Sequence, residues 1–188
     1  MRGWISLTLD PDITTGIERL DRDISAARRA PRLFHDELRP HITLGIFGDI
    51  DVPPAMTALD EFAACFPALP LTFASLGIFL LDPPVLFAAP VVTSRLLEPH
   101  AWLHRRLDGI ALRPDPAYLP GCWVPHCTIA AELPLDALPG VVTLASQLPM
   151  PLTGQASGIC LAACPGGPVL HAVPLPSASQ EERPPGGW

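Results

Sequence analysis

Two short segments of this chain combine residues that could carry acid/base chemistry. Residues 40–44 read Pro-His-Ile-Thr-Leu and residues 125–129 read Pro-His-Cys-Thr-Ile, so each segment has a histidine and a threonine two positions apart. A histidine titrates at about pH 6.5, so a pair can supply a general base and a general acid in one site. Threonine hydroxyls can donate hydrogen bonds to oxygens that gain negative charge. The combination suits in-line displacement at phosphorus and needs no metal ion.

We expect each segment to form a strand that presents these polar side chains on one face. Side chains alternate along a strand, so the histidine, the threonine and the small residue that follows share a face, and the small residue leaves room for a ligand. These residues are His41, Thr43 and Gly45 in the first copy and His126, Thr128 and Ala130 in the second. One such motif is unremarkable in a chain with six histidines, whereas two that both follow a proline indicate a paired site.

The flanking sequence predicts the elements that position the motifs. In the first half we expect a strand at 3–9, an amphipathic helix at 10–30 with a basic end, a strand at 41–48, a helix at 52–66 and a hairpin of 71–81 with 85–91. In the second half we expect a helix at 94–110 kinked or restarted at Pro99, a loop at 113–121, a strand at 123–133, a short helix at 133–148 and a hairpin of 152–164 with 168–175.

The order of these elements indicates an internal duplication, because each half has a motif strand, then a helix, then a hairpin. If the halves pack about a pseudo-two-fold axis, His41 and His126 face each other across one groove. The 188 residues, 48% of them hydrophobic, suffice for one domain. We expect a bilobal domain over 1–176, with lobes at roughly 1–92 and 93–176 whose termini could be exchanged, and a disordered tail at 177–188.

The composition limits the kinds of partner. The formal net charge is -7 and all 12 basic residues are arginines, which argues against a broad phosphate-binding surface, so a nucleic-acid partner is short or held by its end. The most apolar stretch, 76–92, is interrupted by Asp82 and three prolines, so no membrane span is expected. The five cysteines include no C-x-x-C pair and follow no recognisable signal peptide, which predicts reduced thiols and a cytoplasmic location.

At the two motifs, His-Ile-Thr-Leu at 41–44 and His-Cys-Thr-Ile at 126–129, the chain resembles the two-histidine (2H) phosphoesterase superfamily, specifically its 2'-5' RNA ligase-like (LigT-like) proteins. The resemblance implies a bilobal, duplicated α+β fold with antiparallel sheets lining a central cleft and helices packed outside. It also implies the opening or forming of cyclic phosphates and 2'-linked phosphodiesters of nucleotides or short RNA ends, with no metal and no cofactor.

Carried over to this chain, the resemblance implies acid/base roles for His41 and His126 and phosphate-holding roles for Thr43 and Thr128. The sequence does not say which histidine is the base. The absence of lysine departs from RNA-ligating and tRNA-processing members of the family and argues against a long RNA substrate. Two other functions stay open, a nucleotide- or RNA-binding module without turnover and a reversible 2'-5' RNA ligase. The oligomeric state is not predicted.

Four further residues could contact the substrate. Tyr118 and Trp123 flank the second motif and could stack a base, and the alternative is packing of their loop against the core. Arg39 and Arg113 could steer an anionic phosphate, and the alternative is a solvated arginine.

His100 and His104 stand four residues apart, a spacing that can ligate zinc on a helix. No glutamate follows His100 as an H-E-x-x-H motif requires, and no third ligand is evident, so we interpret both as surface or half-buried helix residues and predict no metal site.

Overall fold

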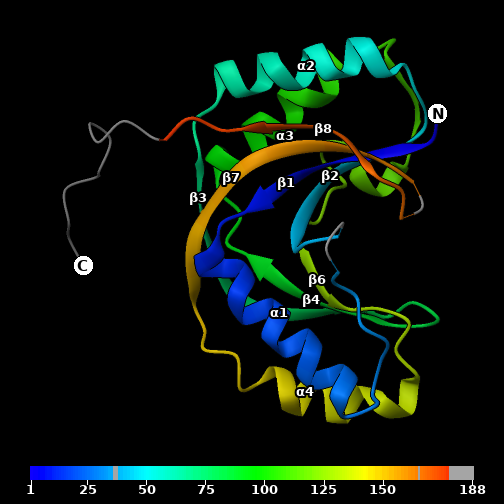
Figure 1. The fold of residues 1–188 in the computed structure, drawn as a ribbon, viewed down its shortest axis with the longest axis vertical. Coiled ribbons are helices and arrows are strands. Elements are labelled where there is room, and N and C mark those ends of the chain that lie inside the picture. The colour runs from blue at the N-terminus through cyan, green and yellow to red at the C-terminus, as the bar shows by residue number, and fades with distance from the viewer. Residues whose placement is uncertain (36–37, 165, 178–188) are drawn as a thin grey trace.

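The structure, a computed structural model, describes residues 1–35, 38–164 and 166–177 and has an α+β fold (Figure 1). The strands are β1 (Gly3–Leu9), β2 (His41–Ile50), β3 (Leu69–Phe79), β4 (Val85–Pro90), β5 (Ala111–Pro114), β6 (Cys127–Ala130), β7 (Leu152–Ala163) and β8 (Val169–Pro174). The helices are α1 (Pro11–Ala26), α2 (Val52–Cys65), α3 (Ser94–Arg106) and α4 (Leu138–Ala145), with short 3₁₀ turns at Pro116–Tyr118 and Leu135–Ala137.

The strands form one curled antiparallel sheet in the order β5-β2-β1-β7-β3-β4-β6, with β8 paired to β7. The long strand β7 pairs with β1 along one part and with β3 along another, and so joins the two ends of the molecule (Figure 1). Helices α1 and α4 lie together at one end, and α2 and α3 lie together at the other.

The strand order interleaves the two halves of the sequence. β7 comes from the second half and lies between β1 and β3 of the first, while β5 and β6 extend the two ends of the sheet. The division into lobes near residue 92 stays a prediction. The tail predicted to be disordered lies, from residue 178 onward, outside the described residues.

Helix α1 starts where its sequence predicts but ends earlier. The Asp10 carboxylate accepts hydrogen bonds from the backbone N–H of Ile13 at the helix N-terminus and of Gln155 on β7, so one side chain caps the helix and joins it to the sheet. The helix ends at Ala26, and Arg28 adopts a positive φ of 53°. The predicted basic end, up to residue 30, is therefore wrong, because the chain leaves the helical conformation before those arginines.

Three other elements differ from their predicted form. Helix α3 continues through Pro99, so of the two predicted outcomes, a kink or a fresh start, the fresh start is wrong. Residues 111–114 form strand β5, which pairs with the end of β2. The predicted loop at 113–121 overlaps this strand. The strand was not predicted because four residues with a positive φ at Arg113 have no recognisable strand pattern. Strand β6 covers only four residues of the predicted 123–133, so His126 lies immediately before it.

The remaining helices and hairpins lie close to their predicted positions. No helix in the described ranges has both the length and the apolar character needed to cross a membrane.

Candidate active site

The two motifs make the same hydrogen bond at their histidines. His41 Nδ1 lies 2.7 Å from the carbonyl oxygen of Arg39, and His126 Nδ1 lies 2.7 Å from that of Val124. A carbonyl oxygen can only accept, so in both rings Nδ1 carries a proton and donates it. The neutral ring then keeps its lone pair on Nε2, which is the atom available to act as a base.

The two motifs also share a β-bulge at their fourth position. On β2, Thr43 pairs with Ser6 and Gly45 with Ile5, which leaves Leu44 without a partner. On β6, Thr128 pairs with Phe87 and Ala130 with Leu86, which leaves Ile129 without one. Each motif therefore places one extra residue directly after its threonine, so the duplication extends to the pattern of strand pairing.

The bulges change which residues face the site. Simple alternation predicts Gly45 beside Thr43, but an extra residue shifts the alternation beyond it. Gly45 is buried, and a Cβ placed on it would come within 2.7 Å of the Phe47 ring. Ala130 is also buried, at 2% exposure. The prediction that these small residues leave room for a ligand is therefore wrong.

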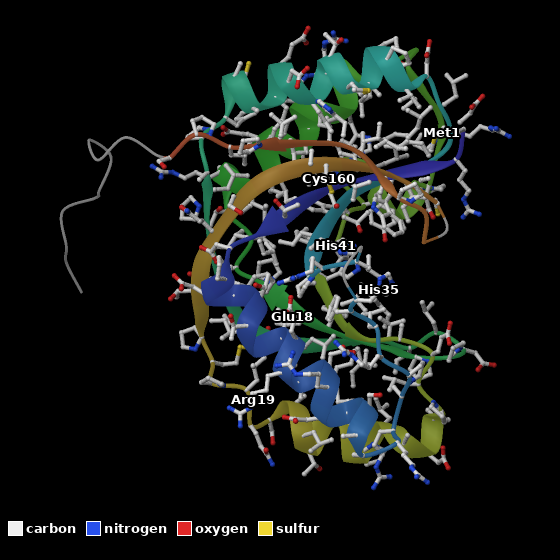
Figure 2. The ribbon with its side chains drawn as sticks, in the orientation of Figure 1. Met1, Glu18, Arg19, His35, His41 and Cys160 are labelled. Atoms are coloured by element: carbon white, nitrogen blue, oxygen red, sulfur yellow. The ribbon has the colours of Figure 1, made fainter. Side chains whose placement is uncertain are left out.

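The curl of the sheet brings the two motifs side by side. β2 and β6 are not neighbours in the strand order, yet they contact each other. The buried Cys127 thiol lies against the backbone of His41. Both histidines and both motif threonines are half-buried. Figure 2 shows His41 between the α1 end and the α2 end of the molecule.

The side chains around the two histidines differ. The His126 ring is surrounded by aromatic rings, with centroid distances of 4.9 Å to Phe79, 5.4 Å to Phe87 and 6.5 Å to Tyr118. The His41 ring stacks on Trp4 at 5.7 Å. The sequence pattern does not indicate Trp4, Phe79 and Phe87 as neighbours of the histidines, because their positions depend on strand register, which that pattern does not fix.

Two histidines of α3 hold the backbone of the first motif. His100 Nε2 lies 3.1 Å from the carbonyl oxygen of Leu44 and 2.9 Å from that of Tyr118, and His104 Nε2 lies 3.0 Å from the Leu44 oxygen. Leu44 is the bulged residue, so its carbonyl group accepts from side chains that substitute for a strand partner. His100 thus ties β2 to the loop that carries Tyr118.

Trp123 completes this connection. Its indole N–H donates to the Thr43 carbonyl oxygen at 3.0 Å, and its ring stacks on His100 at 4.0 Å. The only sequence signal for these roles is the four-residue spacing of His100 and His104, which puts both on one helix face. Within the described residues no group of three or more His, Cys, Asp or Glu side chains could hold a metal ion.

The sequence model of the 2'-5' RNA ligase superfamily matches residues 9–166, which include both motifs and most of the sheet. The chain belongs to this superfamily. The predicted resemblance to 2H phosphoesterases is thereby confirmed.

Solved structures of three other proteins have a similar fold. TT0787 of Thermus thermophilus is 18% identical with a TM-score of 0.66, over 95% of this chain and 100% of that one. E. coli LigT in its apo form is 17% identical with a TM-score of 0.62, and the match covers 94% of this chain and 98% of LigT. Usb1 of Kluyveromyces marxianus is 12% identical with a TM-score of 0.50, and the match covers 93% of this chain and 97% of Usb1. At these identities the likeness is one of fold, and it confirms the α+β class. A comparison with curated proteins gave no match.

The charge states of the two histidines in this superfamily member follow from their surroundings. Burial lowers the pKa of His41, and a proton on His126 lowers it further, while the Arg39 carbonyl opposes the shift. Burial also lowers the pKa of His126. Both rings therefore favour the neutral form when no anion is bound.

Tyr118 and Trp123, the two candidates for base stacking, have different environments. Tyr118 is half-buried near His126, and burial together with the Asp115 charge raises its pKa. Trp123 is only 8% exposed, and one face of its ring is covered by His100. The contacts of Trp123 are those of a packing residue, so we retain Tyr118 alone as a candidate stacking residue.

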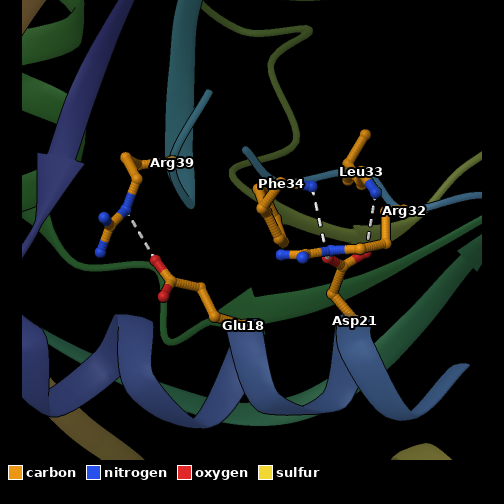
Figure 3. A network of polar contacts seen from close by, with 6 residues as sticks. All are labelled: Glu18, Asp21, Arg32, Leu33, Phe34 and Arg39. Carbon is orange, nitrogen blue, oxygen red and sulfur yellow. Dashed lines mark hydrogen bonds and ion pairs between the residues drawn. The ribbon is translucent and has the colours of Figure 1, made fainter. Parts of the chain in front are cut away.

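Arg39 and Arg113, the candidate phosphate ligands, both have protein partners. Arg39 Nε lies 2.7 Å from a carboxylate oxygen of Glu18 on α1 (Figure 3). Arg113 donates to the carbonyl oxygen of Gly48 at 3.2 Å. Both side chains are exposed enough to turn toward an anion, and neither contact by itself places them at the histidine pair.

The segment that leads to the first motif is also held by α1. The Asp21 carboxylate, 2% exposed, accepts from the backbone N–H groups of Leu33 at 2.8 Å and Phe34 at 3.3 Å, and pairs with Arg32 at 3.3 Å (Figure 3). A buried carboxylate with three donors is well satisfied, and it fixes this stretch of the chain on the surface of the helix.

Proposed function

We propose that the protein is a metal-independent phosphodiesterase that opens 2',3'-cyclic phosphates of nucleotides or short RNA ends. The observation that carries the proposal is the matched pair of half-buried histidines, each with Nδ1 bonded to a backbone carbonyl group and each followed by a threonine. Such rings keep Nε2 for proton transfer and cannot easily change tautomer.

In the proposed reaction one neutral histidine takes a proton from water through Nε2. The water oxygen forms a bond to phosphorus, and the bond between phosphorus and one ribose oxygen breaks. The other histidine, protonated, gives its proton to that ribose oxygen, so the products are a phosphomonoester and a free hydroxyl group. The hydroxyl groups of Thr43 and Thr128 donate hydrogen bonds to the non-bridging oxygens.

The lowered pKa values are compatible with this scheme because the substrate is an anion. Two neutral rings give a base but no acid. A bound phosphate favours the protonated form of an adjacent imidazole and so raises its pKa, which supplies the acid only when substrate is present.

The superfamily assignment supports the reaction class, and relatives support the ligand class. E. coli LigT has been crystallised with 3'-AMP and with NADP+, which shows that this fold accommodates nucleotides in that protein. For this chain we propose a nucleotide or a short RNA end bearing a cyclic phosphate or a 2'-5' linkage as the ligand. A cytoplasmic location stays a prediction.

The test is turnover of 2',3'-cyclic AMP and of a short RNA with a 2',3'-cyclic end, in EDTA, as a function of pH. We expect a bell-shaped rate profile for the wild type and its loss in both His41→Ala and His126→Ala. Turnover retained in both variants would refute the proposal. Binding without turnover would instead support a nucleotide- or RNA-binding module, and joining of RNA ends would support a reversible 2'-5' ligase.

A further inference from the structure

A pocket of about 500 Å³ opens at the end of β2 that is remote from His41. Its lining residues are Arg2, Ile46, Gly48, Arg113, Pro114, Asp115 and Pro116. They come from the start of β1, the second half of β2 and the segment that contains β5 and the turn after it. The pocket is therefore built on the strands that carry the first motif, but it includes neither catalytic histidine.

The pocket and His41 lie on the same face of the sheet. Residues directly opposite each other on paired strands share a face. On β1 and β2 these pairs are Thr8 with His41, Ser6 with Thr43 and Trp4 with Ile46. Alternation along β1 puts Trp4, Ser6 and Thr8 on one face, so the bulge at Leu44 brings Ile46 to the His41 face in place of Gly45.

Trp4 connects the histidine to the pocket. Its ring stacks on the His41 ring at a centroid distance of 5.7 Å with 20° between the ring planes, and its backbone pairs with Ile46 of the pocket. The ring is half-buried. A continuous strip thus runs from the catalytic histidine over an aromatic ring to the pocket. Their partners on β1, Thr8 and Trp4, are four residues apart, so from the rise of a strand His41 and Ile46 are roughly 13 Å apart.

The charge of the pocket suits an anion. The Arg2 side chain makes no hydrogen bond or ion pair with the residues that the structure describes. Arg113 donates one hydrogen bond, to the carbonyl oxygen of Gly48, and its charge also acts on the exposed Asp49 carboxylate. The single carboxylate among the lining residues, Asp115, already accepts from the backbone N–H of Ala117. The chain has a net charge of -7 and no lysine, yet the lining of this pocket has two arginines and one carboxylate.

We propose that this pocket is a second phosphate subsite, which holds a further phosphate group of a substrate whose reacting phosphate lies at the histidine pair. The inference rests on the proposed function and deepens it. A 2',3'-cyclic mononucleotide has no second phosphate to offer, whereas an oligonucleotide has backbone phosphates and a mononucleotide can carry a 5'-phosphate. The length of the strip favours the oligonucleotide, with Trp4 in contact with one of its bases or sugars.

The experiment is equilibrium binding to three probes that need no turnover. The probes are 3'-AMP, adenosine 3',5'-bisphosphate and a trinucleotide RNA with a 3'-phosphate. The proteins are the wild type, Arg2→Gln and Arg113→Asn, the latter because asparagine tolerates the positive φ of residue 113. The matched control is Arg19→Gln, whose side chain is 80% exposed on α1. Thermal unfolding verifies that each variant is folded.

We measure how much more tightly each protein binds the trinucleotide than 3'-AMP. Because a hydrogen bond to a charged group is worth more than one kcal/mol, each pocket variant should reduce this ratio about tenfold, and Arg19→Gln should keep the wild-type ratio. A plot of the logarithm of the binding constant for the trinucleotide against the logarithm of the salt concentration should become less steep by about 0.7 for each arginine lost.

The outcomes separate the subsite from the reaction. An arginine-dependent gain for the bisphosphate as well would support the subsite and identify a 5'-phosphate as its ligand. A ratio that is the same in the pocket variants as in Arg19→Gln would overturn the subsite, as would a wild type that binds the trinucleotide no better than 3'-AMP. Arginine-dependent binding by a wild type that cleaves no cyclic phosphate would refute the proposed reaction and leave the subsite standing.

Discussion

The first motif begins a ten-residue strand inside the sheet, whereas the second lies at the start of a four-residue strand at the end of the sheet. The backbone next to His41 is held by polar groups from α3 and the following loop, and the ring of His126 is enclosed by Phe79, Phe87 and Tyr118. Both rings nevertheless make the same hydrogen bond to the carbonyl group two residues before them. The hydrogen bond that the two copies share lies within each motif, whereas the contacts that support each histidine come from other elements and differ between the copies.

This difference suggests that the two copies have equivalent chemistry but unequal supports. An edge strand gains little from strand pairing, so a ring at its start needs packing to keep it in place. A central strand is fixed by its neighbours, and its bulge then requires separate hydrogen bonds for the carbonyl group that it leaves unpaired.

The largest effect is expected from removing the imidazoles. His41→Ala and His126→Ala should each reduce kcat for a cyclic phosphate by about 10²- to 10⁴-fold, because each loses one proton-transfer group. Combining them should cost little more than the larger single loss, since acid and base act as a unit. The control is His171→Ala on β8, whose ring contacts Asp60 rather than the site. A large loss in only one copy would show that the chemistry is unequal as well.

The next effect is on stability and tests the polar support of the first motif. Burial, followed by the nearby His104, lowers the pKa of His100 to about 4, from an ordinary value of 6.5. The unfolded state then binds a proton more readily than the folded state, so this group causes stability to fall as the pH drops from about 6.5 to about 4. At 1.36 kcal/mol per pKa unit, the loss approaches about 3 kcal/mol at pH 4.

His100→Gln keeps an N–H donor and removes this titration. The measurement is the free energy of unfolding against pH for the wild type and the variant. His41, His104 and His126 also have lowered pKa values, so their titration also contributes to the pH dependence of stability, and the difference between the two curves is the quantity to compare. Curves that remain parallel between pH 7 and pH 4 would show that His100 does not carry this dependence.

Two glycines allow the packing around Phe87, next to the second motif, to be compared with the packing around Phe47, next to the first. A Cβ on Gly77 would lie 2.2 Å from the Phe87 ring, and a Cβ on Gly45 would lie 2.7 Å from the Phe47 ring. Overpacking of this kind costs about 1–3 kcal/mol, so both alanine variants should unfold at lower temperature. Of the two phenylalanines, Phe87 contacts the His126 ring, so Gly77→Ala should lower kcat more than Gly45→Ala does when both are assayed well below their Tm. Equal kcat values would count against a role for the aromatic rings in holding His126.

The sequence predicted the parts of the site that depend on neighbouring residues. The two Pro-His-x-Thr segments and most helices lie where pattern and turn residues indicate. Register and close packing could not be predicted, because the Leu44 and Ile129 bulges arise from pairing with strands far away in sequence. The same register pairs Trp4 with Ile46. The pocket that contains Arg2 and Arg113 depends on this pairing and could not be predicted either.

The smallest effect is expected from a single donor that joins the two regions. Trp123→Phe keeps a ring to stack on His100 but loses the indole N–H that donates to Thr43, which should cost about 1 kcal/mol of stability. The loop from Tyr118 to the second motif would then be held to β2 by His100 alone among these side chains. If this link sets the spacing of the two histidines, kcat should fall while KM for the cyclic phosphate changes little. A shift in Tm with unchanged kcat would mean that the strands alone set the spacing.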